Sequence, residues 1–78
     1  MELERRGLSM KVVKEVLASP EQRLEVRPGR VVLQSRFRMG EPARVYLVRI
    51  FVDVDRRPAE VVTAYRTSGV RRYWKGTP

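Results

Sequence analysis

The sequence predicts an α+β fold in which one short helix packs on an antiparallel sheet of three or four strands. Two patterns predict this class. Apolar residues first recur at helical spacing over residues 9–18, and from residue 24 onward they alternate with polar residues, as in strands. The chain has 78 residues, so we expect a single domain over residues 1–78 with a small core.

The helix is expected at residues 9–18. Ser9 is a suitable N-cap, because its hydroxyl can accept a hydrogen bond from the first turn, and Leu8 and Val13 flank it as a hydrophobic staple. Met10, Val13 and Leu17 are expected on one apolar face, with Val12 and Val16 on its flank. Pro20 ends the helix, since the residue before a proline avoids the helical conformation. A helix this short is not stable alone, so it must pack on the sheet.

Four strand segments follow the helix. They are Leu24–Val26, Val31–Met39, Arg44–Val54 and Ala59–Arg66. Proline and glycine residues typical of turns separate the segments. The third segment carries apolar residues on both faces, which predicts an internal strand.

The residue types that the chain lacks exclude several chemistries. Without cysteine there is no disulfide scaffold, thiolate zinc site or cysteine nucleophile, and without histidine there is no imidazole base or ligand. Asp53 and Asp55 resemble a metal pair, but beside Arg56 and Arg57 a turn role fits better. We therefore expect no metal and no cofactor. No apolar run is long enough to span a bilayer and no signal peptide is evident, so we expect a cytoplasmic protein that does not bind membranes.

The charge is strongly positive. Seventeen lysines and arginines against nine acids give a formal net charge of +8, and arginine is much commoner than lysine. Because arginine binds phosphate through a planar fork and stacks on bases, this composition favours a nucleic-acid partner. A GC-rich genome or adaptation to heat would also favour arginine.

The last third of the chain combines a strand with a basic, aromatic tail. Such a mixture suits single-stranded nucleic acid, since cations bind the phosphates and flat rings stack on the bases. The candidate RNA-binding residues are Arg36, Arg38, Tyr65, Arg71, Arg72, Trp74 and Lys75. The alternative is a terminal strand whose aromatic residues pack on the core and whose charges are solvated. Of Tyr73 and Trp74 we expect one in the core and the other exposed, because neighbours in a strand face opposite ways.

Several short segments carry a resemblance to a known family. They are Arg6-Gly7-Leu8-Ser9, Val16–Pro20, Pro28-Gly29-Arg30, Val61–Ser68 and Arg72-Tyr73-Trp74. Together they resemble small bacterial domains of unknown function that are placed near the RelE/ParE toxins and are similar to the BrnT toxins. The resemblance covers nearly the whole chain. It implies a RelE-like fold and a toxin that cleaves mRNA and is held in check by an acidic antitoxin. Family members usually carry a histidine in a fuller first helix, which this sequence lacks.

Candidate catalytic residues follow from the chemistry of RNA cleavage. The 2′-hydroxyl attacks the adjacent phosphate, so an enzyme must stabilise the negative charge and protonate the leaving oxygen. We assign Arg66 to the scissile phosphate, Arg49 to the developing charge, and Tyr73 to base stacking or proton donation. Arg66, Tyr73 and one or more of Arg36, Arg38 and Arg49 are then expected to converge on one concavity. The alternative for the strand arginines is an ordinary solvated sheet face.

Three classes of function fit the sequence. The first is a RelE-like endoribonuclease of a toxin–antitoxin pair, and the second is a non-catalytic RNA-binding module. The third is a partner-binding domain that receives an acidic antitoxin-like peptide, or a second copy of the chain in a homodimer, along an exposed strand edge.

Overall fold

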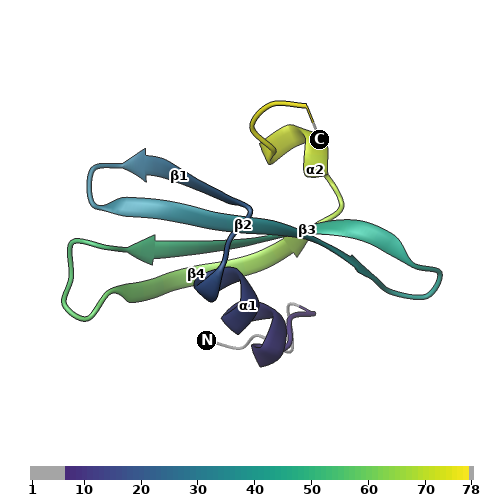
Figure 1. Ribbon diagram of the computed structural model, residues 1–78, viewed down its shortest axis with the longest axis horizontal. Helices are drawn as coiled ribbons and strands as arrows, with labels where there is room; N and C mark the ends of the chain where they lie inside the picture. Colours follow the sequence, from purple (N-terminus) through teal and green to yellow (C-terminus); the bar gives the residue numbers. More distant parts are fainter. Residues whose placement is uncertain (1–6, 78) are drawn as a thin grey trace.

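The computed structural model describes residues 7–77. A four-stranded antiparallel sheet carries a helix on one face and a short C-terminal helix on the other (Figure 1). In chain order the elements are α1 (Met10–Ala18), β1 (Gln22–Arg27), β2 (Arg30–Met39), β3 (Arg44–Asp53), β4 (Glu60–Thr67) and α2 (Val70–Tyr73). The predicted α+β class is confirmed, and α2 is an element that the sequence did not predict.

The sheet is a meander in which each strand pairs with the next one along the chain, in the order β1-β2-β3-β4. The ladder between β2 and β3 is unbroken from the pair Arg30 and Asp53 to the pair Met39 and Arg44. β3 is therefore internal, as predicted, and it ends one residue earlier than expected. Its alternate residues are buried on opposite faces, with Val48 and Ile50 towards α1 and Leu47 on the other side.

The ends of α1 follow the prediction. Ser9 is the N-cap, and its hydroxyl oxygen accepts a hydrogen bond from the amide of Val12 at 3.2 Å. Leu8 and Val13 are both buried in the same core cluster, as a hydrophobic staple requires. The helix ends at Ala18, and Ser19 caps it one residue before Pro20.

The apolar face of α1 was predicted wrongly, because the expected flank faces the sheet and two of the three expected face residues are exposed. Val13 and Val16 are buried and Val12 packs against them, whereas Met10 and Leu17 are 56% and 39% exposed. The reason is geometric: Val12 and Val16 lie on one side of Val13 around the helix, and Met10 and Leu17 lie on the other. α1 is rotated on the sheet towards its valines, which leaves the two longer side chains at the solvent edge.

A carboxylate–guanidinium pair joins the first residue of β2 to the last residue of β3, at the end of the ladder away from the β2–β3 hairpin. Arg30 Nε and Nη2 donate to Asp53 Oδ1 and Oδ2 at 2.6 and 3.0 Å, and the Asp53 residue is only 8% exposed. These hydrogen bonds hold the pKa of Asp53 below its ordinary value. Asp53 is thus a strand-end ion-pair partner, and Glu60 likewise pairs with Arg56 at 3.5 Å.

We expect Asp53→Asn to lower the urea midpoint at pH 7 and to flatten its dependence on pH in acid. A carboxyl whose pKa is lower when folded contributes fully above the unfolded pKa of about 3.9 and loses that contribution as pH falls towards the folded value. Urea unfolding between about pH 7 and pH 2 measures this. Glu25→Gln, an exposed β1 carboxyl with no ion pair within residues 7–77, is the control. Equal acid sensitivity in Asp53→Asn and the wild type would contradict the assignment.

Candidate nucleic-acid interface

A row of polar side chains crosses all four strands on the face of the sheet opposite α1. Gln22, Gln34, Arg49 and Tyr65 stand beside one another in the strand register and form this polar row. Gln34 Nε2 donates to Gln22 Oε1 at 2.8 Å, and Arg49 donates to Gln34 Oε1 at 2.9 Å and to the Tyr65 hydroxyl at 2.8 Å. Gln34 is fully buried, so the row is a structural network and not a solvated face.

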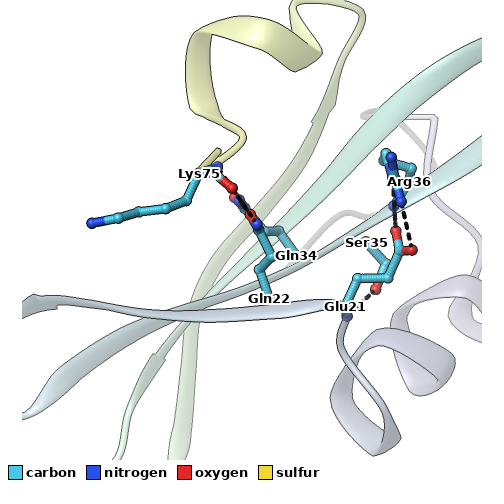
Figure 2. Close-up of polar contacts among 6 residues, drawn as sticks. All are labelled: Glu21, Gln22, Gln34, Ser35, Arg36 and Lys75. Carbon is cyan, nitrogen blue, oxygen red and sulfur yellow. Dashed lines mark hydrogen bonds and ion pairs between the residues drawn. The ribbon is translucent and has the colours of Figure 1, made fainter. Parts of the chain in front are cut away.

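The polar row holds the C-terminal segment, residues 70–77, on the sheet. The Gln34 amide donates to the backbone carbonyl of Tyr73 at 3.1 Å. Gln22 makes a two-way contact with the backbone of Lys75: its Nε2 donates to the carbonyl at 2.8 Å, and its Oε1 accepts from the amide at 3.1 Å (Figure 2). Side chains of β1 and β2 therefore bind the backbone of the C-terminal segment over the face of the sheet.

Aromatic rings surround the centre of the row. The Arg49 guanidinium carbon lies 4.2 Å from the Tyr73 ring centroid and 5.2 Å from that of Phe51. The Tyr65 ring meets the Tyr73 ring edge to face, with centroids 6.5 Å apart. Arg49 and Tyr73 are thus brought together, as predicted, and Tyr65 joins them. Their rings and the guanidinium contact one another and the polar row.

Tyr73 and Trp74 are both half-buried, which corrects the expectation that one would be core and the other exposed. The expectation treated these residues as part of a strand. They lie instead at the end of the single helical turn of α2, where neighbours are about 100° apart around the axis. Both rings can then face the sheet, and each is covered by an arginine.

Arg36 covers Trp74. Its guanidinium carbon lies 4.1 Å from the centroid of the tryptophan ring. Glu21 fixes the orientation, because its two carboxylate oxygens accept from Arg36 Nε and Nη2 at 3.2 and 3.1 Å and Oε1 also accepts from the backbone amide at 2.7 Å (Figure 2). These hydrogen bonds hold the pKa of Glu21 below its ordinary value and raise that of Arg36. The Arg36 side chain stays 37% exposed.

A basic depression lies next to this stack. It encloses about 630 Å³ between the β2–β3 hairpin and the C-terminal segment, and its lining residues are Arg36, Val45, Val70, Arg71, Gly76 and Thr77. None of these carries a carboxylate. Arg38 is paired with Val45 in the ladder and so lies on the same face. Arg38, Arg71, Arg72 and Lys75 are exposed, and none forms an ion pair within residues 7–77.

Arg66 does not join these residues, and the predicted convergence of Arg66 with Arg49 and Tyr73 is wrong. Arg66 is paired with Val48, whose side chain belongs to the core beneath α1. Its guanidinium carbon lies 4.6 Å from the ring centroid of Tyr46 on that face. The reason is the alternation of a strand: Tyr65 and Arg66 are neighbours in β4 and point to opposite sides of the sheet.

Sequence reasoning missed the residues that build the site. Glu21 positions Arg36, Gln22 positions the C-terminal segment, and Gln34 positions Arg49. Glutamines and exposed acidic residues belong to no sequence motif that would have marked them as part of a site. Gln34 was the one residue of the three that the strand pattern could have pointed to. It is polar, lies on the strand face opposite Val31 and Leu33, and pairs with Arg49 in the ladder. Within residues 7–77 no group of three acidic residues lies close enough to hold a metal ion. None of the helices in that range has the length and apolar character needed to span a bilayer.

No protein-family model matches the chain, and neither a curated protein nor a solved structure matches it significantly. The RelE-like fold and the toxin family therefore stay predictions from the sequence resemblance.

We expect Gln34→Leu to destabilise the protein by about 1–3 kcal/mol, because the Arg49 guanidinium and the Tyr73 carbonyl would lose a buried partner. The loss should be concentrated in the C-terminal segment. Hydrogen exchange of the Lys75 amide, whose acceptor Gln22 is positioned by Gln34, should be faster than in the wild type. Arg23→Gln, an exposed change in β1, is the control. Unchanged protection of Lys75 in Gln34→Leu would show that other contacts hold the segment.

Proposed function

We propose that this protein is an RNA-binding module that holds single-stranded RNA on the face of the sheet carrying the C-terminal segment. The observation that supports it best is the basic depression beside the Arg36–Trp74 stack, which has arginines and apolar side chains in its lining and no carboxylate. Cations are needed for the phosphates, and flat groups are needed for unpaired bases.

Arg36 suits the stacking role. One side of its guanidinium rests on Trp74, and Glu21 binds its edge in a two-pronged ion pair, so the plane is held before any ligand arrives. Bases stack on arginine planes as they do on aromatic rings. Since the ion pair with Glu21 offsets the charge of Arg36, this residue contributes a surface for a base more than a cation for a phosphate.

Four other residues suit the phosphate role. Arg71 lines the depression, Arg38 lies beside its lining residue Val45, and Arg72 and Lys75 are exposed in the C-terminal segment. None of the four has an ion pair within residues 7–77. A strand of RNA crossing the depression would meet Arg71 of the C-terminal segment and Arg38 of β2. This arrangement favours RNA over an acidic protein partner, since it offers a flat stacking plane as well as charge.

The geometry favours binding without cleavage. Cleavage as predicted from the sequence needs Arg66, Arg49 and Tyr73 at one phosphate, and the sheet separates Arg66 from the other two. Arg49 is also committed to the polar row through Nε and Nη1. We therefore propose RNA binding, and cleavage of the bound RNA is an outcome that the same experiment would detect.

We expect the full chain to bind a fluorescent single-stranded RNA with an affinity that falls steeply with salt, because each phosphate contact releases a counterion. Arg38→Gln and Arg71→Gln should each reduce the slope of log affinity against log salt by about 0.7. Arg57→Gln is the matched control. It removes the same charge from the turn after β3, about 30 Å along the strand from Val45, and should leave the slope unchanged.

Two further readouts separate the alternatives. Trp74 is the only tryptophan, so its fluorescence should change on RNA binding, and Arg36→Lys should weaken binding by loss of the stacking plane without loss of charge. Gel analysis of the same RNA tests for cleavage. An equal effect of Arg57→Gln and Arg71→Gln would contradict the interface, and absence of binding at low salt would leave the acidic partner or homodimer as the better proposal.

A further inference from the structure

Arg66 is a second basic feature, which the proposed interface does not use. It lies in β4 on the α1 face of the sheet and is half-buried. Its guanidinium packs on two neutral side chains: the carbon lies 4.6 Å from the ring centroid of Tyr46, and Nη1 lies 3.1 Å from the sulfur of Met39. These contacts position the group but do not neutralise its charge.

Gly7 fixes the guanidinium further. A Cβ on Gly7 would lie 2.6 Å from Nε, 2.7 Å from Cζ and 2.8 Å from Nη2 of Arg66. The backbone of Gly7 also has φ of +70°, a conformation that side chains disfavour. Only a glycine lets the chain approach the guanidinium so closely, and the fork is held by Tyr46, Met39 and Gly7 together.

Among the described residues, 7–77, the fork of Arg66 has no strong acceptor. A half-buried guanidinium ordinarily pairs with a carboxylate, because withdrawing a charge from water is costly without a counter-charge. Within residues 7–77 Arg66 forms no ion pair, and its hydrogen bond goes to a thioether, which is a weak acceptor. Within residues 7–77 neither Nε nor Nη2 of Arg66 has a hydrogen-bond acceptor, and these two donors of a guanidinium match two oxygens of an oxyanion.

Arg44 adds a second cation on the same face. It is paired with Met39 in the β2–β3 ladder, and it lies two residues before Tyr46 in β3. Arg44, Met39 and Tyr46 therefore project from the same side of the sheet as Arg66. Arg44 is exposed and forms no ion pair within residues 7–77. Two arginines suit a doubly charged phosphate better than a singly charged carboxylate.

We propose that Arg66 and Arg44 form a binding site for the phosphate group of a phosphate monoester, on the face of the sheet opposite the RNA interface. The Arg66 fork binds two phosphate oxygens, and Arg44 contributes the second positive charge. The inference is independent of the proposed function, because it uses none of the residues that line the basic depression.

The test is titration of the full chain with inorganic phosphate at constant ionic strength, followed by NMR of the arginine Nε–H signals. Arg66→Lys identifies the Arg66 signal by its loss. The expected result is a saturable shift of that signal in the wild type. By thermal shift, phosphate affinity should be at least about tenfold weaker in Arg66→Lys, which keeps the charge and loses the fork, and also weaker in Arg44→Gln. Arg57→Gln, an exposed change in the turn after β3 that lies in neither basic feature, is the control and should match the wild type.

Three results would overturn the site. One is no saturable shift of the Arg66 signal, which would mean that the fork has its acceptor within the chain. Another is an equal response to sodium acetate, which would mean a carboxylate site. The last is an equal loss of affinity in Arg57→Gln, which would mean diffuse charge. Circular dichroism of each variant without phosphate separates loss of the site from loss of the fold, and Arg44→Gln leaves the packed fork intact.

Discussion

The two-residue period of β3 is the constraint on which the rest of this structure depends. β3 pairs with β2 on one side and β4 on the other, so its residues cannot turn without breaking two ladders. Val48 and Ile50 are thereby assigned to the core under α1, and Leu47 and Arg49 to the face under the C-terminal segment. Through the register, β3 also decides on which face each residue of β2 and β4 lies. This places the basic depression and Arg66 on opposite faces of the sheet.

The parts of the fold that depend on local pattern could be predicted from the sequence. Ser9 and Pro20 mark the helix, and the alternation of Val31 to Met39 marks a strand, because caps and periodicity act between residues close in the chain. The internal position of β3 followed from its two apolar faces. The rotation of α1 did not, since which side of Val13 meets the sheet is decided by packing against residues far along the chain.

The candidate site was predicted in its residue types and only partly in its geometry. The sequence indicated arginines and aromatic residues. In the structure Arg36 contacts Trp74, and Arg49 contacts Tyr73. It could not show that Arg66 faces the other way until the register of β4 was known. Nor could it show that Gln34, which has no chemistry of its own to attract notice, holds Arg49 and the backbone of Tyr73 at once.

The contact between Gln22 and Lys75 has a consequence for the order in which the molecule can assemble. Every strand pairs with its sequence neighbour, so the sheet forms through short loop closures, whereas this contact joins residues 53 apart. Closing a longer loop costs more chain entropy before it is rewarded by a contact. The hairpins can therefore form while the tail is still free, and the surface beneath the tail, with Arg49 and its aromatic neighbours, is complete only when the last residues have docked.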